Sequence, residues 1–402
     1  MSSLHRAVVE VSGEVVGDLA APGRPEPAVF MYGAEVPESS AVSVTMPVAG
    51  QVYSYDGLHP VFAQNLPEGY LGDIIRKHVA KLYGSGDLTV LAALGRHQVG
   101  RVVVSDPGAE AGSEFADGES LSSLLSADNA GLFEELLDKY ALRSGVSGVQ
   151  PKVLVPGTIS EKTTLRTRGY IVKTWGDDYP QLAANEYFCM TVAKACGLPV
   201  PDFYLSDNGR LFVMTRFDRD DSGNWLGFED ACVLQGLLPA DKYSGSYEKL
   251  AKTMRAYLSP EYRVRDLRWL FLSVAVSWAV RNGDAHLKNF GLLYESPFAK
   301  RWLAPVYDIV STTPYLSGDV PALTLQGRKV WWPVDYLVQF GRLSCGMSAL
   351  QVYKDLELLA SKLELVAQDI EHYCKANPEF CEVGGVMVNT YQASAQEIMK
   401  SL

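Results

Sequence analysis

The sequence predicts an α+β protein with a strand-rich amino-terminal part and a mostly helical carboxyl-terminal part. Residues 6–19 alternate apolar and polar side chains around a glycine, a pattern typical of a β-hairpin. From about residue 228 onward, long segments with helical apolar spacing dominate, including 246–257, 266–280 and 348–375. Strands concentrated in one part and helices in the other favour an α+β class.

Composition favours a soluble, cytoplasmic protein of two or three domains. The chain has 402 residues, 47% hydrophobic and 21% charged, which is ordinary for a globular protein with a substantial core. It contains no uncharged apolar run long enough to cross a membrane, and residues 1–6 lack a signal-peptide core, so no membrane association is expected. Its six cysteines are scattered without a Cys-x-x-Cys pair, which favours reduced thiols over a disulfide framework or a metal finger.

The charge balance disfavours independent binding to nucleic acid. There are 36 Lys and Arg against 47 Asp and Glu, for a net charge of −11. Because nucleic-acid binding draws on basic side chains to neutralise phosphates, any contact with DNA is expected to pass through a basic partner. The six histidines include no pair at i, i+4, which disfavours a zinc hydrolase.

The first 105 residues are expected to form a small α+β domain. After the hairpin, strands are predicted within 28–47, the last of them at Val42–Pro47. Helices are predicted near 70–82 and 87–95, and a strand at 98–104. A stretch rich in Gly, Ala, Ser, Asp and Glu follows at 105–120 and is predicted to be a linker or exposed loop. The expected domains are therefore 1–105, 106–225 and 226–402.

The middle domain is predicted to begin with a helix near 129–139 and a Gly/Ser-rich loop ahead of an apolar strand. Backbone N–H groups of such a loop could cover phosphates, although glycine and serine are equally common in ordinary turns. Lys173 lies near the end of the next strand, where it could reach ATP phosphates or remain solvated. A helix carrying Glu186 and two further strands follow. This order is that of a protein-kinase-like bilobal fold.

The segment Asn282–Phe290, followed by Tyr307-Asp308, is the most informative part of the chain. Asn289 lies five residues after Asp284, and Asp308 lies nineteen residues after Asn289. Phosphoryl transfer by a kinase needs one Asp to accept the proton of the acceptor hydroxyl, and an Asn and a second Asp to hold Mg²⁺ on ATP. The spacing therefore predicts a catalytic loop.

The neighbouring segments favour this interpretation. A long apolar helix is predicted before the loop, at 267–280, and short strands are predicted after it at 290–294 and 302–310, the second reaching Asp308. Such a helix, loop and strand pair would bring Asp284, Asn289 and Asp308 to one rim. The alternative is a solvated turn with scattered acidic residues.

Several segments together resemble the HipA family of bacterial toxin kinases over nearly the whole chain. The matching segments are Phe62–Gly69, Ser147–Lys152, Ile171–Lys173, Asn185–Tyr187, Arg216–Arg219, Gly283–Phe290 and Tyr307-Asp308. The resemblance implies a Ser/Thr protein kinase that uses ATP and Mg²⁺ and pairs with a small helix-turn-helix, DNA-binding antitoxin. Known members phosphorylate an aminoacyl-tRNA synthetase, which arrests growth.

The resemblance also implies roles for individual residues. Asp284 would be the catalytic base, Asn289 and Asp308 would hold Mg²⁺, and Lys173 would contact ATP phosphates. The remaining residues implied to bind ATP are Ser147, Gly148, Val149, Gln150 and Lys152 in the phosphate loop, Thr215, Arg216 and Phe217 at the hinge, and His286, Lys288 and Tyr307. For His286, bracing the loop is an equal alternative to direct contact with ATP.

Family members can autophosphorylate a serine of the phosphate loop and so silence themselves, because the added charge repels ATP phosphates. Here Gly145 occupies a position that often carries this serine, so Ser147 is the better candidate and Ser144 a weaker one. Two alternatives to a toxin kinase remain: a small-molecule kinase on the same fold, and an inactive co-repressor that binds the antitoxin. The intact Asp284, Asn289, Asp308 and Lys173 favour an active enzyme.

Overall fold

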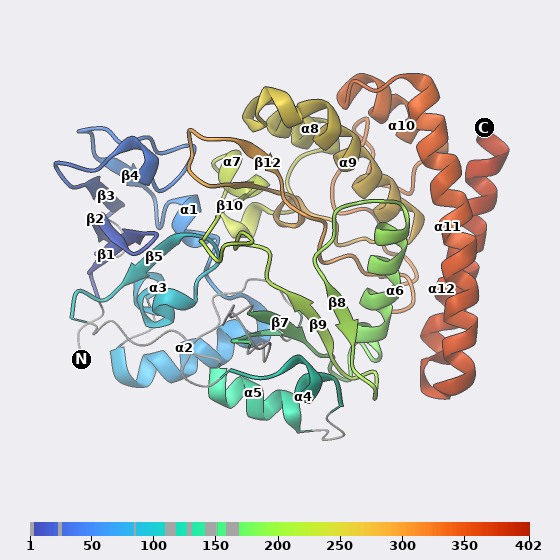
Figure 1. Cartoon of the computed structure of the whole chain (residues 1–402), viewed down its shortest axis with the longest axis horizontal. Helices are drawn as coiled ribbons and strands as arrows, with labels where there is room; N and C mark the ends of the chain where they lie inside the picture. Colours follow the sequence, from blue (N-terminus) through green and yellow to red (C-terminus); the bar gives the residue numbers. More distant parts are fainter. Residues whose placement is uncertain are drawn as a thin grey trace. The chain divides into compact units, whose positions relative to one another are not determined.

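The computed structural model (Figure 1) describes residues 4–22, 26–83, 86–108, 118–126, 131–140, 150, 152–157 and 169–402. The chain divides into two compact units. The strand-rich unit comprises Met1–Thr174, Ser206–Pro239 and Leu293–Arg301, and the helical unit comprises Trp175–Leu205, Ala240–Leu292 and Trp302–Leu402. The α+β fold class is confirmed. The domain boundaries near residues 105 and 225 stay predictions.

The predicted hairpin is formed by β1 (Arg6–Val11) and β2 (Glu14–Ala20). Ser12 and Gly13 connect them with φ angles of 52° and 89°, as a two-residue hairpin turn requires. The hairpin belongs to a five-stranded sheet of order β4-β3-β2-β1-β5. The other strands are β3 (Ala28–Tyr32), β4 (Tyr53–Tyr55) and β5 (Val102–Ser105).

The strand predicted at Val42–Pro47 is wrong. Side chains elsewhere take the backbone N–H groups that a strand would use in a ladder: Val42 donates to the Tyr32 hydroxyl at 2.8 Å, and Val44 donates to the Glu229 carboxylate at 2.8 Å. The segment keeps a single isolated bridge between Ser43 and Met46. Tertiary hydrogen bonds therefore override the strand propensity of this sequence.

The helices predicted in the first 105 residues are present. They are α2 (Gly69–Tyr83) and α3 (Asp87–Leu94), preceded by the single turn α1 (Pro60–Ala63). Helix α3 packs on β1 and β5 and so covers one end of the five-stranded sheet. Two further helices of this unit are α4 (Leu121–Ser126) and α5 (Leu132–Tyr140).

Three antiparallel strands form the second sheet region of the strand-rich unit: β6 (Lys152–Val155), β7 (Tyr170–Lys173) and β9 (Phe212–Thr215). Strand β7 lies between the other two. Every residue of β6 and β9 is buried, as expected for strands covered on both faces. Helix α5 packs on β6.

A buried acid joins the first hundred residues to later parts of the same unit. Glu229, in β10 (Gly227–Asp230), accepts hydrogen bonds from the Ser43 hydroxyl at 2.7 Å, from the Val44 backbone and from the Tyr294 hydroxyl. Burial raises the pKa of Glu229, while these donors stabilise its charged form. Arg101 is also buried, and its guanidinium donates to the Glu295 carbonyl at 2.9 Å.

The helical unit is built around α9 (Pro260–Ala279), whose second half is almost entirely buried. The segments predicted at 246–257 and 348–375 correspond to α8 (Tyr247–Tyr257) and α11 (Ala349–Ala376). Arg268 of α9 makes two hydrogen bonds, at 2.8 and 2.7 Å, to the buried Asp355 carboxylate of α11. The unit also contains α6 (Leu182–Ala195), β8 (Phe203–Leu205) and α10 (Val334–Gln339).

Helices α11 and α12 (Cys381–Ser401) lie side by side as a hairpin (Figure 1). Sequence reasoning missed α12, because Gly384 and Gly385 lower its intrinsic helix propensity. Gly384 is required for close packing: a Cβ there would lie 2.7 Å from the Cys374 sulfur. None of the helices in the described part of the chain is long and apolar enough to span a membrane.

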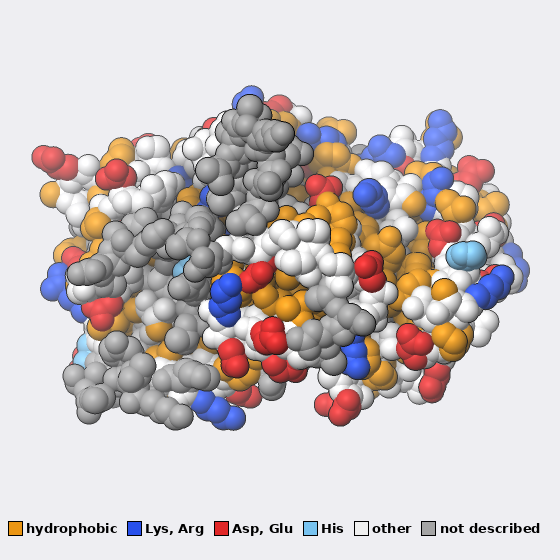
Figure 2. All heavy atoms as spheres, turned by 60° about the horizontal axis from the view of Figure 1, so that its bottom comes forward, with side chains coloured by type: hydrophobic (Ala, Val, Ile, Leu, Met, Phe, Trp, Pro, Cys, Tyr) orange, Lys and Arg blue, Asp and Glu red, His pale blue; other side chains and the backbone are white. Residues whose placement is uncertain are grey.

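Figure 2 shows one face of the molecule, on which charged side chains of both signs lie among apolar and uncharged atoms. The arrangement agrees with a net charge of −11 carried on a chain that still contains 36 basic residues.

Candidate active site

The predicted catalytic loop follows directly on α9. The helix ends because Arg281 adopts a left-handed conformation, with φ of 56°, and the Asn282 N–H turns back to the Ser277 carbonyl at 2.8 Å. The buried Asn282 side chain then accepts the Asp284 N–H at 3.0 Å. Asp284 is therefore placed by a rigid helix and a braced turn, as a catalytic group requires.

The Asp319 carboxylate occupies the space that a side chain at residue 283 would fill. A Cβ at this position would lie 1.8 Å from the carboxylate of Asp319. The Gly283 N–H donates to the Thr312 hydroxyl at 3.0 Å, which joins the loop to a later segment. Only glycine therefore fits immediately before Asp284 without displacing Asp319.

Asp308 does not lie at the end of a strand as predicted. Strand β12 (Arg301–Leu303) is shorter, and the following residues have irregular structure. Pro305 provides no N–H for a ladder, which explains the early end of the strand. Asp308 itself is left-handed, with φ of 62°, a conformation that Asp tolerates better than most residues. Strained backbone of this kind is common at functional sites.

The predicted catalytic loop and the Asp308 segment are joined at three points. The Asn289 amide donates to the Asp308 carboxylate at 3.1 Å, and the Tyr307 hydroxyl donates to the Lys288 carbonyl at 2.6 Å. Thr312 supplies the third link through its hydroxyl, which also donates to the Arg281 carbonyl at 2.9 Å. The structure thus brings together Asn289 and Asp308, the two predicted metal ligands.

Asn289 and Asp308 fit a magnesium site. Both carry side-chain oxygen atoms. The Asn289 amide nitrogen donates to Asp308, while the amide oxygen accepts the His286 N–H and keeps a second lone pair for an ion. Mg²⁺ is usually held by one or two carboxylates, with water and substrate phosphates completing its octahedron. Among the residues that the structure describes, no group of three or more His, Cys, Asp or Glu could hold a metal by itself. A metal here would therefore depend on phosphate ligands.

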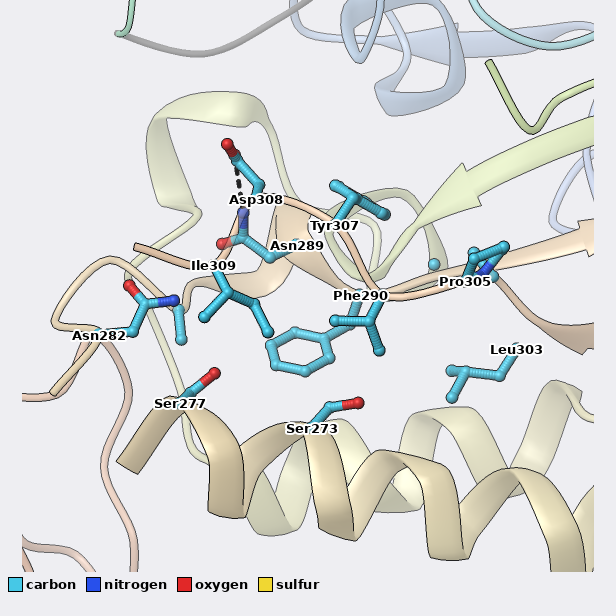
Figure 3. A pocket seen from close by; sticks show the side chains of 14 residues that line it. Ser273, Ser277, Asn282, Asn289, Phe290, Leu303, Pro305, Tyr307, Asp308 and Ile309 are labelled. Carbon is cyan, nitrogen blue, oxygen red and sulfur yellow. Dashed lines mark hydrogen bonds between the residues drawn. The ribbon is translucent and has the colours of Figure 1, made fainter. Parts of the chain in front are cut away.

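A small cavity of about 20 Å³ lies behind these two residues (Figure 3). Ser273 and Ser277 of α9 point into it from one side, and Phe290 and Ile309 lie between α9 and the Asn289–Asp308 pair. This volume holds about one water molecule and is far too small for a nucleotide. The residues that line the cavity therefore support Asn289 and Asp308 from below and do not form the nucleotide pocket.

His286 is buried and neutral. Burial, together with the positive charges of Lys242 and Lys288, lowers the pKa of His286 to about 3. Its backbone N–H donates to the Asn289 side-chain oxygen at 2.8 Å, which orients the amide toward Asp308. This backbone contact agrees with the loop-bracing role. Contact between His286 and ATP stays a prediction.

Two lysines of the strand-rich unit stand next to each other. Lys152 and Lys173 are directly paired residues of the antiparallel strands β6 and β7, so their side chains extend from the same face. Both are buried, at 4% and 2% exposure. Lys152, predicted to end the phosphate loop, is thus a strand residue. Basic side chains that extend from one face of a sheet are suited to contact phosphate.

Of the residues predicted in the phosphate loop, only Gln150 and Lys152 lie in the described part of the chain. Ser147, Gly148 and Val149 lie outside the described residues, as do Ser144 and Gly145. The Gln150 amide donates to the Thr174 carbonyl at 3.2 Å.

The predicted hinge follows β9. Thr215 is buried at the end of that strand, and the Phe217 ring packs edge-on against Phe228. The Arg216 guanidinium forms a buried ion pair with Asp218 at 2.5 Å. We therefore expect Arg216 to act through its backbone.

Sequence reasoning missed Tyr243 and Lys242, and it noted Asn185 only within the HipA-like segment Asn185–Tyr187, without a role. The Tyr243 hydroxyl donates to Asp284, and the buried Lys242 faces His286. No motif spacing marks Tyr243, which lies 41 positions before Asp284. Asn185 is fully buried in α6, and polar residues inside an apolar helix pattern were the available signal.

Asn185 holds the segment that carries Asp308. Its amide donates to the Ser311 carbonyl at 2.8 Å and accepts the Ser311 N–H at 2.7 Å. We expect Asn185→Ala to lower the free energy of unfolding by about 3 kcal/mol, because it leaves two buried backbone groups without partners. Urea unfolding measures this. The control Asn389→Ala, on the exposed face of α12, should change stability by less than about 0.5 kcal/mol. Equal effects would contradict the role of Asn185.

The fold and the loop define a class: an α+β, protein-kinase-like fold with an Asp, Asn and Asp around one loop. Two protein-family models match the chain and identify its family. A model described as the HipA N-terminal domain matches residues 7–105, and one described as the HipA-like C-terminal domain matches 144–372. The chain belongs to the HipA family, which confirms the resemblance.

Individual relatives agree with this assignment. Y4dM of Sinorhizobium fredii, provisionally named a kinase, is 28% identical over 295 residues, covering 67% of this chain and 66% of the relative. A Haemophilus influenzae protein, also provisionally named a kinase, is 32% identical over 188 residues, covering 42% and 53%. The chain thus spans less than two thirds of the length of these relatives.

A solved structure supports the fold. The chain is similar to one in the complex of Shewanella oneidensis HipA, HipB and operator DNA, with a TM-score of 0.71 and 18% identity. The similarity covers 98% of this chain and 97% of that chain. At this identity it establishes the fold and not the activity.

Proposed function

We propose that this protein transfers the γ-phosphoryl group of ATP to a serine or threonine of a protein, in the presence of Mg²⁺. The observation that carries the proposal is the contact between Asn289 and Asp308 at 3.1 Å, linked through the same loop to Asp284. An Asp that accepts the substrate proton, together with an Asn and a second Asp that carry metal-binding oxygen atoms, is the set of residues that phosphoryl transfer uses. The provisional kinase names of two relatives agree with it.

In this mechanism, Asp284 accepts the proton of the substrate hydroxyl. The hydroxyl oxygen forms a bond to the γ-phosphorus while the bond from that phosphorus to the β–γ bridging oxygen breaks, and ADP leaves. Asn289 and Asp308 would hold Mg²⁺, which supplies positive charge that stabilises the phosphates. Catalysis then rests on positioning and electrostatics, which a loop cross-linked at three points provides.

Lys152 and Lys173 are proposed to bind ATP phosphates. We expect Lys152→Met and Lys173→Met each to weaken ATP binding by about 10- to 100-fold, because each removes a charge-assisted hydrogen bond of about 1.5–3 kcal/mol. Isothermal titration with ATP measures this in the full chain. Lys300→Met, an exposed position of the same unit, is the matched control. If both variants bound ATP like the control, the lysine pair would not be the phosphate site.

We further propose that the protein is the toxin of a toxin–antitoxin pair. The structurally similar chain comes from a complex with HipB and operator DNA, which supports a small DNA-binding antitoxin as the partner. A net charge of −11 agrees with contact to DNA through that partner. The substrate proposed is a component of translation such as an aminoacyl-tRNA synthetase.

The test is incubation of the full chain with γ-labelled ATP and Mg²⁺, alone and with a cell lysate, followed by mapping of phosphorylated residues by mass spectrometry. Label on serine or threonine of a lysate protein is expected. Label on small molecules only would favour a small-molecule kinase, and neither ATP binding nor transfer would favour an inactive co-repressor. Label on Ser147 would support self-silencing.

A further inference from the structure

A tyrosine hydroxyl lies on the proposed catalytic base. The Tyr243 hydroxyl donates to the Asp284 side-chain oxygen Oδ1 at 2.6 Å. The Tyr243 side chain is 44% exposed, and its ring lies edge-on to His286 with centroids 5.2 Å apart. All three residues belong to the helical unit. The contact is therefore well formed and yet open to solvent on one side.

The Tyr243 hydroxyl occupies the position on Asp284 that the hydroxyl of a substrate would take. A general base must lie within about 2.6–3.2 Å of the oxygen whose proton it takes. Tyr243 satisfies that distance with the same kind of group, an O–H donor, that a substrate would present. An acceptor that approaches this oxygen of Asp284 must therefore compete with Tyr243.

We propose that Tyr243 is a pseudosubstrate, meaning an internal hydroxyl that occupies the acceptor position on Asp284 and leaves it when a hydroxyl-bearing substrate binds. The inference rests on the proposed function. It makes Tyr243 a gating residue, which limits transfer of the phosphoryl group to water when no protein substrate is bound.

The backbone around Tyr243 favours release by side-chain rotation. The Lys242 carbonyl accepts the Leu287 N–H at 3.0 Å, which ties the turn to the catalytic loop. On the other side, the Gly245 carbonyl accepts the Thr324 hydroxyl at 3.1 Å. With both flanks held, the Tyr243 ring can move without displacing Asp284. Rotation of a half-exposed side chain is also fast compared with typical turnover.

The test is hydrolysis of Mg-ATP by the full chain without a protein substrate, so that water is the probe acceptor. We expect Tyr243→Phe to raise kcat about tenfold, because a hydrogen bond to a charged group contributes roughly that factor. The KM for ATP should change less than about twofold, because the contact is to the base. Loss of a merely structural tyrosine would lower kcat.

Tyr247→Phe is the matched control. This tyrosine is buried in the same unit, and its hydroxyl donates to the Ala285 carbonyl at 2.9 Å instead of to Asp284. Its removal should not raise kcat. A lower or unchanged kcat in Tyr243→Phe, an equal rise in Tyr247→Phe, or phosphate found on Tyr243 itself would overturn the inference.

Different outcomes would contradict the role of Tyr243 and the proposed kinase function. Turnover that Asp284→Asn abolishes but Tyr243→Phe does not raise would leave the kinase intact and remove the gate. If no variant transfers phosphate from Mg-ATP either to water or to a lysate protein, the proposed function fails. In that case the hydrogen bond between Tyr243 and Asp284 is tested by itself. The urea unfolding midpoints of Tyr243→Phe, Asp284→Asn and the double variant are compared, and shifts that simply add would show that the two side chains do not interact.

Discussion

Asp284→Asn is expected to lower phosphoryl transfer by about 10³-fold, because general base catalysis typically contributes 10²–10⁴. The Asn side chain is nearly isosteric, keeps an oxygen that can accept the Tyr243 hydroxyl, and leaves the Asn282 contact to the backbone N–H in place. The fold should therefore be retained. The measurement is transfer from γ-labelled ATP, with circular dichroism to verify folding.

The matched control for this variant is Asp335→Asn, at an exposed residue in the first turn of α10. It makes the same chemical change in the same unit and should leave transfer unchanged. Transfer by Asp284→Asn at more than about a tenth of the wild-type rate would exclude Asp284 as the base, since that loss is below what a base contributes.

Asp308→Asn is expected to reduce turnover by about 100-fold at a fixed Mg²⁺ concentration, because a bound metal contributes several kcal/mol and about 1.4 kcal/mol corresponds to tenfold. Asn also tolerates the left-handed conformation that Asp308 adopts, with φ of 62°. Its side-chain oxygen can still accept the Asn289 amide. The substitution therefore removes a charge with little change of shape.

The measurement for Asp308→Asn is turnover as a function of Mg²⁺ concentration. Because the lost interaction is with the metal, the half-saturating concentration of Mg²⁺ should rise. Asp335→Asn again serves as the control. A Mg²⁺ dependence equal to that of the wild type would show that Asp308 does not bind the metal.

Local sequence pattern was sufficient for much of the fold. The hairpin at 6–19 has its glycine turn, and α8, α9 and α11 lie where apolar spacing predicts them. These elements depend on neighbours a few residues apart, which a sequence displays directly. The strand expected at Val42–Pro47 and the missed α12 failed because distant side chains and close packing determined them.

The sequence by itself also placed Asp284, Asn289 and Asp308 as a candidate set and, through the HipA-like segments, indicated the family. The tertiary structure alone decided how those residues meet. It pairs Lys152 with Lys173 across two strands, turns Asp308 into a left-handed conformation and places Tyr243 on Asp284. The physical reason is the separation of these residues along the sequence. The contacts that set this geometry join residues from 19 to 126 positions apart, and only the folded chain brings them together.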